Sequence, residues 1–324
     1  MITPAIQAPS APALPAALFT PEIKGIGLGL VAAAIWGAYL AMAKAGVSAG
    51  LEPSDIAFIR YGVAGLVMLP WLLAKGVRTC GGVGWGRAVI LSLLVGPLFI
   101  LIGVGGYRFA PLAHGAVMQP AALTIVSLLL AATILNDRPT IGRVLGIVGM
   151  FAGLVIIAGP GLMTGTTLTP VGDAMFIVAG SMWAVFTLLT KIWKVAPLAA
   201  TAAVSVLSAA VYVPGYLLVV GVDRLLDATA SMLLAQVVVQ GILSGVVAVI
   251  AFTKATALLG AARAALFPAM VPAVAIVLGI PLAGEIPTAL QLVGVGVVTA
   301  ALLVALGVVR ADLGRALRRP ARRR

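Results

Sequence analysis

Long apolar stretches alternate along this chain with short connections that are rich in glycine, proline and charged residues. A helix needs roughly 20 apolar residues to cross the hydrocarbon core of a bilayer. Ten stretches meet this requirement, at residues 24–44, 55–74, 87–107, 112–135, 141–159, 171–191, 197–220, 232–253, 262–283 and 288–309. The pattern therefore predicts an all-α polytopic membrane protein with ten transmembrane helices.

The composition excludes several classes of protein. Of the 324 residues, 62% are hydrophobic and only 9% are charged, whereas roughly 25% of residues are charged in a typical soluble domain. So few charged side chains cannot cover a soluble surface, which excludes a soluble enzyme and a nucleic-acid-binding protein. One cysteine and one histidine also argue against a multi-cysteine or histidine-cluster metal site. We therefore predict no catalytic residues, no metal, no cofactor and no nucleic-acid partner, with the lipid bilayer as surroundings.

The distribution of charge predicts an orientation. If the N-terminus is cytoplasmic, 17 of the 21 lysines and arginines lie on the cytoplasmic side of the ten helices. The four exceptions are Lys44, Arg60, Arg108 and Arg224. Cytoplasmic loops carry an excess of basic residues in membrane proteins, so we expect both termini inside the cell.

Both ends of the chain are expected to be tails. Residues 1–22 are rich in alanine and proline and lack the basic region of a signal peptide, which predicts a flexible cytoplasmic tail. Residues 310–324 are arginine-rich, and such a run binds anionic lipid headgroups at the cytoplasmic surface.

The two halves of the chain resemble each other. Trp36 and Trp183 are 147 residues apart, as are Lys44 and Lys191. Pro120 is followed 17 residues later by an acid in Asn-Asp-Arg-Pro-Thr, and Pro268 is followed 17 residues later by an acid in Gly-Glu-Ile-Pro-Thr. We therefore divide the chain into a first five-helix unit, 23–160, and a second, 161–309.

Five helices per unit is an odd number, so the two copies must lie upside down relative to each other in the membrane. Inverted repeats of this kind form the architecture of secondary transporters, in which substrate binds near the midplane between the halves. The sequence therefore predicts alternating-access transport of a small molecule.

The repeated motifs resemble a known family. Each unit has an acid-x-Pro-Thr turn after its fourth helix and a glycine-rich fifth helix, which is similar to the EamA branch of the drug/metabolite transporter superfamily. The second unit follows the Leu-Gly-Glu pattern of that family closely, with Ala283-Gly284-Glu285, whereas the first departs from it with Leu135-Asn136-Asp137. The departure keeps the carboxylate.

Within that family, ten helices and an aromatic first helix most resemble the bacterial YddG-type amino-acid exporters. The resemblance implies export of amino acids, aromatic or neutral ones among them, or of related small metabolites across a bacterial inner membrane. A multidrug exporter of hydrophobic cations is the alternative. The sequence leaves open whether the protein is a monomer or a homodimer.

Polar residues inside a predicted transmembrane helix indicate a structural or functional role, because their transfer into lipid costs free energy. Gln236, Gln240 and Ser244 recur every four residues on the eighth helix, which places them on one face. We expect Gln240 and Ser244 to line the substrate cavity, with Ser92 on the third helix as a partner. The alternative is that these residues bind a neighbouring helix and hold it in place.

Aromatic residues mark equivalent positions in the two units. Trp36 and Tyr39 share a face of the first helix, and Trp183 and Phe186 share the equivalent face of the sixth, with Thr187 beside them. Tryptophan in membrane proteins concentrates at the lipid–water interfaces, yet both of these lie at mid-depth. We expect them to line a pocket for an apolar side chain, with core packing as the alternative.

Prolines interrupt the fourth and ninth helices, where each removes a backbone hydrogen bond and bends the helix. These are Pro120, which follows Gln119, and Pro268 with Pro272. A bent helix leaves carbonyl groups free to bind an ammonium group or water. Equivalent bends in both units predict gates that move alternately, with Gln119 at the substrate.

Two ionisable residues complete the candidates. Arg60 lies inside the second helix and is expected to pair with a substrate carboxylate, or with Asp55 or Glu52. The alternative is that it reaches the membrane surface as an anchor. His114 begins the fourth helix. No Asp or Glu lies deep within a predicted helix, so coupling to protons would use His114, use the charge of the substrate, or be absent.

Overall fold

The computed structural model describes residues 20–134, 136, 140–163, 168–260, 264 and 266–305, without the side chains of 158–163 and 266. Within these ranges the protein is helical and contains no strand. Both predicted tails, nearly all of 1–22 and all of 310–324, lie outside the described residues, as does the acid Asp137 of the first unit.

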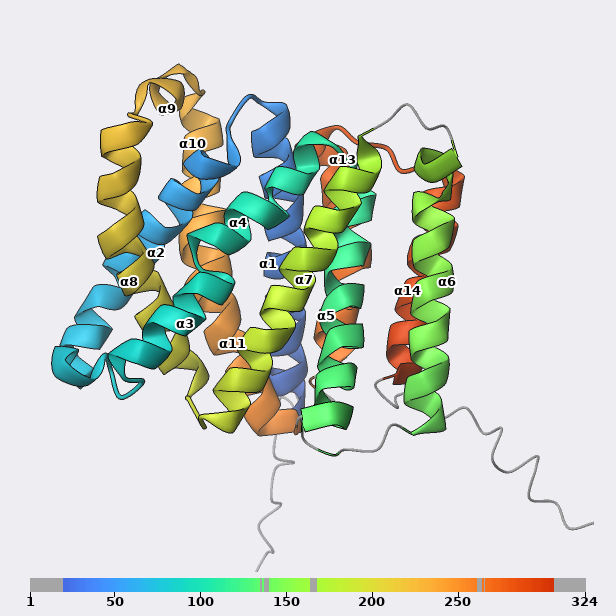
Figure 1. Cartoon of the computed structure of the whole chain (residues 1–324), viewed down its shortest axis with the longest axis horizontal. Helices are drawn as coiled ribbons and strands as arrows, with labels where there is room; N and C mark the ends of the chain where they lie inside the picture. The colour runs from blue at the N-terminus through green and yellow to red at the C-terminus, as the bar shows by residue number, and fades with distance from the viewer. Residues whose placement is uncertain are drawn as a thin grey trace, which may run out of the picture.

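Helices of the first half form the blue-to-green part of Figure 1. They are α1 (Pro21–Ser48), α2 (Pro53–Lys75), α3 (Trp85–Val95), α4 (Pro97–Gly103), α5 (Leu112–Ile134) and α6 (Ile141–Met163). Two short 3₁₀ turns, η2 (Val77–Thr79) and η3 (Gly105–Arg108), connect them.

The second half supplies the yellow-to-red helices of Figure 1. They are α7 (Thr169–Ile192), α8 (Pro197–Val219), α9 (Asp223–Asp227), α10 (Ala230–Gln236), the π-helix η4 (Val237–Val247), α11 (Ala248–Leu259), α13 (Leu266–Ala283) and α14 (Ala289–Ala305). α10, η4 and α11 follow one another without a break, so they form one long helix with a π-helical centre.

Seven helices or runs of consecutive helices in the described part of the chain, Trp85–Arg108 among them, are long and apolar enough to cross a membrane. Three shorter apolar helices accompany them, Ile141–Ile157, Phe267–Ala283 and Ala289–Ala305. Each of the ten predicted stretches therefore contains helix in the described residues. The count of ten crossings stays a prediction.

The third predicted helix, 87–107, is broken rather than continuous. α3 ends at Val95 and α4 begins at Pro97. Proline has no N–H to continue the helical ladder, and a Cβ on Gly96 would lie 2.1 Å from the carbonyl oxygen of Ser92, so only glycine fits the bend. The Tyr61 hydroxyl donates to the freed carbonyl of Val95 at 2.5 Å. A side chain of a neighbouring helix thus supplies the hydrogen bond that the Val95 carbonyl loses at the break.

The two halves run in opposite directions. The α1–α2 connection lies at the upper end of the molecule in Figure 1, whereas the equivalent α7–α8 connection lies at the lower end. Packing follows the same symmetry, because α1 packs against α13 as α7 packs against α5, while α2 pairs with α8 and α6 with α14. The arrangement is that of an inverted repeat.

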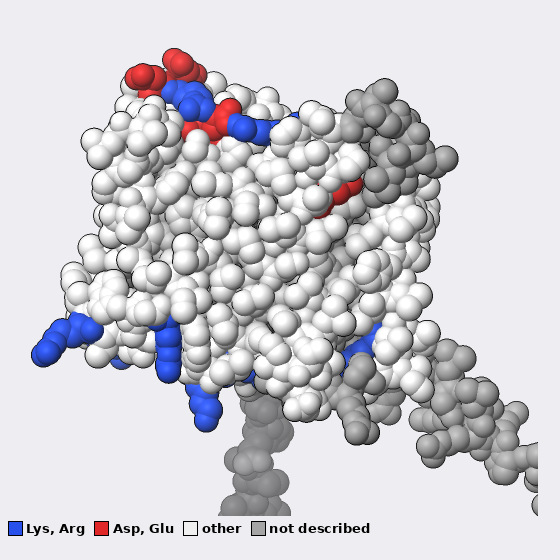
Figure 2. All heavy atoms as spheres, in the orientation of Figure 1, with Lys and Arg blue, Asp and Glu red and all other residues white. Residues whose placement is uncertain are grey.

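Charge separates between the two ends of the bundle. Figure 2 shows acidic side chains gathered at the upper end, with basic side chains projecting from the lower end. We call the upper end, which holds the α1–α2 and α8–α10 connections, the acidic end. The lower end, which holds the α2–α3 and α7–α8 connections, is the basic end.

Glycines let α6 and α14 approach closely. A Cβ on Gly146 would lie 2.5 Å from the Cβ of Ala305 and 2.7 Å from its backbone nitrogen. A Cβ on Gly153 would lie 2.4 Å from a methyl of Val298. The small residues of α6 therefore pack against another helix of the same chain.

We expect Gly146→Ala to lower the free energy of unfolding in detergent by about 1–3 kcal/mol, because the new methyl meets backbone that cannot move aside. Gly296→Ala on α14 is the matched control, since nothing lies within 4 Å of its Cβ position. Thermal unfolding of both variants checks the prediction. Equal stability of the two would contradict close α6–α14 packing.

Candidate functional site

A cavity lies between the two halves and has two lobes. The wide lobe has a volume of about 580 Å³ and the deep lobe about 380 Å³. Six residues line both lobes, namely Trp36, Arg60, Trp183, Thr187, Ser244 and Phe252. Because these residues come from α1, α2, α7, η4 and α11, both repeats contribute to what we call the central cavity.

The wide lobe extends to the basic end. Its lining includes Thr190 near the end of α7, Pro197 at the start of α8 and Thr256 near the end of α11. The deep lobe lies between α1, α5, α7 and α13, and Gln119, Pro120 and Pro268 line it. Access to the central cavity is therefore from the basic end.

Arg60 carries the only charged side chain lining the two lobes in the described part of the chain. Its Nη1 donates to the Ser244 hydroxyl at 2.6 Å, and its guanidinium carbon lies 4.9 Å from the ring centroid of Tyr39 and 5.9 Å from that of Tyr61. None of the carboxylates in the described ranges pairs with it. A partly buried charge without a counter-ion is costly, so the site suits an anionic group.

Two aromatic clusters flank Arg60, and each of them combines residues of both repeats. Trp36 packs against Phe252 with ring centroids 5.3 Å apart. Trp183 packs against Phe99 at 5.2 Å and against Phe186 at 5.8 Å. Apolar faces of this kind bind the hydrocarbon part of a small molecule.

The structure brings most of the predicted site residues to this cavity. Lining one lobe or both are Trp36, Tyr39, Arg60, Gln119, Pro120, Trp183, Phe186, Thr187, Ser244 and Pro268. Sequence reasoning missed Phe99 and Phe252. Phe252 lies eight residues after Ser244, so an extension of the predicted polar face by two turns would have found it.

Gln240 does not line the central cavity, contrary to the prediction. It is fully buried, and its Nε2 donates to the carbonyl of Tyr39 on α1 at 3.1 Å. Gln236 makes the equivalent contact to the carbonyl of Met42 at 2.7 Å. Both amides hold η4 and α10 against α1, because a buried amide in apolar surroundings is stabilised by a carbonyl on the next helix.

Ser92, His114 and Pro272 also lie away from both lobes. The Ser92 hydroxyl is buried in the packing of α3, where it has no hydrogen-bond partner among the described residues. His114 on α5 lies 2.8 Å from a carboxylate oxygen of Asp173 on α7, and both residues are buried. The histidine therefore joins the two repeats near the acidic end.

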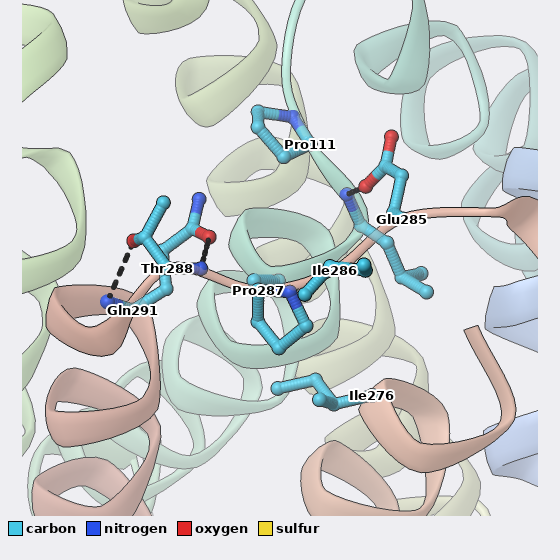
Figure 3. A pocket seen from close by; sticks show the side chains of 9 residues that line it. Pro111, Ile276, Glu285, Ile286, Pro287, Thr288 and Gln291 are labelled. Atoms are coloured by element: carbon cyan, nitrogen blue, oxygen red, sulfur yellow. Dashed lines mark hydrogen bonds between the residues drawn. The ribbon is translucent and has the colours of Figure 1, made fainter. Parts of the chain in front are cut away.

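Lys44 and Glu285 close the acidic end above the deep lobe. The Lys44 ammonium lies 3.0 Å from the Glu285 carboxylate and donates to the carbonyls of Tyr107 and Ala110 at 3.0 and 3.4 Å. Glu285 also accepts from the backbone N–H of Leu112 at 2.6 Å, as Figure 3 shows. A carboxylate at a helix N-terminus is stabilised by the helix dipole. α1, α5 and the α13–α14 connection are thereby joined.

The Glu-x-Pro-Thr turn of the second repeat positions this carboxylate. Thr288 and Gln291 exchange hydrogen bonds, the Thr288 N–H donating to Gln291 Oε1 at 2.9 Å and the Gln291 N–H to Thr288 Oγ1 at 3.2 Å (Figure 3). This capping box starts α14. Pro287 precedes it, and Glu285 projects toward α5 from the other side of the turn.

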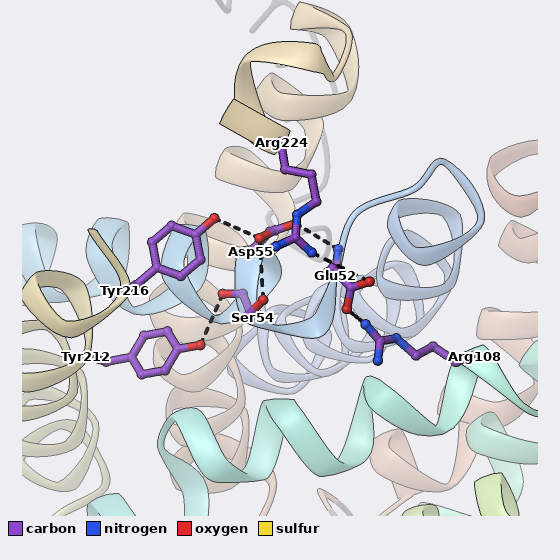
Figure 4. A network of polar contacts seen from close by, with 7 residues as sticks. All are labelled: Glu52, Ser54, Asp55, Arg108, Tyr212, Tyr216 and Arg224. Atoms are coloured by element: carbon purple, nitrogen blue, oxygen red, sulfur yellow. Dashed lines mark hydrogen bonds and ion pairs between the residues drawn. The ribbon is translucent and has the colours of Figure 1, made fainter. Parts of the chain in front are cut away.

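A second polar network closes the acidic end beside α9 (Figure 4). Glu52 pairs with Arg108 and lies 3.6 Å from Arg224, which in turn lies 3.7 Å from Asp55. The Tyr216 hydroxyl donates to Asp55 at 2.7 Å. The pairs of Glu52 with Arg108 and Arg224 are partly exposed, and exposed ion pairs contribute about 0–1 kcal/mol each. Asp55, by contrast, is fully buried.

We expect Glu285→Gln to open the acidic end more often, because it removes the charge that pairs with Lys44. Leu123→Cys lines the deep lobe and, combined with Cys80→Ser, gives one reporter thiol. Its labelling by an impermeant reagent from the acidic end should accelerate severalfold in the Glu285→Gln protein. Unchanged labelling of a folded variant would show that Glu285 does not hold this end closed.

Comparison with known proteins agrees with the geometry. The EamA-like transporter family matches residues 23–159 and 170–307. An uncharacterized transporter of Archaeoglobus fulgidus is 26% identical over 158 residues, which cover 48% of this chain and 53% of that protein, so this chain spans about half the length of that relative. A crystal structure described only as that of a protein has the same fold, with a TM-score of 0.61 and 17% identity over 90% of this chain and 98% of its own. The protein therefore belongs to the EamA-like transporter family.

Proposed function

We propose that this transporter exports amino acids, or related small metabolites that carry a carboxylate, by alternating access. The observation that carries the proposal is Arg60, a cation without a counter-ion among the described residues, set between aromatic walls in a cavity that reaches one end of the protein. A substrate carboxylate would bind the guanidinium through charge-assisted hydrogen bonds.

The cavity supports a small substrate with an apolar part. Small-molecule sites are typically roughly 300–1,000 Å³ and mostly apolar, with few polar groups that fix orientation. The two lobes match that description, because Trp36, Trp183 and Phe252 face both of them. This lining favours neutral or aromatic amino acids among the candidates.

A multidrug exporter of hydrophobic cations is less well supported. Recognition of a cation in an apolar cavity calls for a carboxylate or a cage of aromatic faces. Among the described residues neither lobe is lined by Asp or Glu, and Arg60 at the junction of the lobes repels a cation.

We further propose that the basic end faces the cytoplasm of a bacterium and that the protein resides in its inner membrane. The excess of basic side chains at that end supports the orientation. In this orientation the structure is open to the cytoplasm and closed outside, as an exporter is before it takes up substrate.

Replacing Arg60 tests the proposed function. In proteoliposome counterflow with a panel of amino acids, we expect Arg60→Gln to reduce flux roughly 10- to 100-fold, since hydrogen bonds to charged groups contribute about 1.5–3 kcal/mol. Arg60→Lys should retain part of the flux because it keeps the charge. Arg78→Gln, an exposed arginine at the basic end, is the control. Normal flux through a folded Arg60→Gln protein would refute carboxylate recognition.

Cysteine labelling tests the orientation. Cys80 is buried, and burial raises the pKa of its thiol, so the native cysteine is a slow reporter and is replaced by serine. In that background, Asp227→Cys at the acidic end should react with an impermeant thiol reagent in intact cells. Arg78→Cys at the basic end should react only after permeabilisation. The reverse pattern would place the basic end outside.

A further inference from the structure

We propose that Gln119 binds the ammonium group of the substrate, so that the central cavity selects amino acids over carboxylic acids that lack this group. The inference rests on the proposed function, in which Arg60 binds the carboxylate. It adds the second charge of the zwitterion and the residue that recognises it.

Gln119 lies in the deep lobe, which Arg60 also lines. It is half-buried on α5, directly before Pro120. Its side-chain oxygen faces Gly103 of α4, where an added Cβ would lie 3.8 Å away. One lobe of about 380 Å³ therefore presents a guanidinium from α2 and an amide from α5.

The Gln119 amide makes no hydrogen bond to any described residue. Gln236 and Gln240, by contrast, each donate to a carbonyl of α1 and so stabilise helix packing. Gln119 is only half-buried and is not among the residues with buried unpartnered atoms, so its amide is open to the lobe. Because this amide contributes nothing to helix packing, it is available to a ligand.

The second repeat shows that the residue before the equivalent proline need not be glutamine. Phe267 precedes Pro268 there, 148 residues after the Gln119–Pro120 pair. Its ring packs on α1, where a Cβ on Gly29 would lie 2.1 Å from it. An apolar side chain thus serves at the equivalent position of the other repeat, and the amide of Gln119 is a feature of the first repeat alone.

The chemistry of the lobe fits an ammonium group. Glutamine Oε1 accepts hydrogen bonds from a cation, and the faces of Trp36 and Trp183 add favourable cation–π contacts. A neutral acceptor binds ammonium more weakly than a carboxylate does. A simple amine therefore gains too little to overcome repulsion by Arg60, whereas a zwitterion satisfies both groups.

The experiment compares phenylalanine with 3-phenylpropionate, which has the same carbon skeleton without the ammonium group. Counterflow of both is measured in proteoliposomes containing the full-length protein. Gln119→Met, which keeps the size but removes the acceptor, should lower the flux ratio of phenylalanine to 3-phenylpropionate roughly tenfold. Gln119→Glu, which keeps an acceptor and repels the anion, should preserve or raise the ratio.

Thr133→Val is the matched control, because it also removes a polar group from α5 but at an exposed position outside the cavity; its ratio should equal that of the unmodified protein. Equal loss of both fluxes in Gln119→Met, or an unchanged ratio, would overturn the inference. If the unmodified protein carries both compounds equally and in an Arg60-dependent manner, the proposed function stands and this inference fails. If it carries neither, both fail.

Discussion

Polar groups inside an apolar bundle are stabilised by hydrogen-bond partners within the protein, and this constraint shapes the packing of several helices. The Tyr61 hydroxyl satisfies the break between α3 and α4, and Gln236 and Gln240 bind carbonyls of α1. His114 and Asp173 satisfy each other. Arg60 and Gln119 differ from these residues. In the described structure Arg60 has no carboxylate partner, and the Gln119 amide has no hydrogen-bond partner. The central cavity lies between them.

The inverted repeat explains why one end is open while the other is closed. Each end of the bundle is built from elements of both halves, and the inverted symmetry gives the two ends equivalent elements with exchanged roles. In this structure Lys44, Glu285 and the Glu52–Arg108–Arg224 network join elements at the acidic end, while the wide lobe reaches the basic end. Exchange of these roles between the halves is the physical basis of alternating access.

Helix α1 connects the central cavity to the closed end. Its Tyr39 ring lies over Arg60 and its Tyr39 carbonyl binds Gln240, while Lys44, little more than one turn later, pairs with Glu285. A movement of α1 that repositions Tyr39 also moves Lys44. The central cavity and the closed acidic end are thus joined through one helix, which also binds η4 along its side.

The sequence by itself determined the helical architecture, the repeat and most of the cavity lining. Helix length and apolarity are local properties of the sequence. Trp36 and Trp183 occupy equivalent positions in the two repeats, so their spacing along the chain predicts equivalent positions in the fold. Only the tertiary structure decided that Ser244 faces the cavity while Gln240 faces α1, that Gly96 breaks the third helix, and that Lys44 pairs with Glu285. Those outcomes depend on which helix lies opposite each side chain. Helical periodicity specifies the face on which a residue lies but not the neighbour it meets there, because the packing of distant segments selects that neighbour.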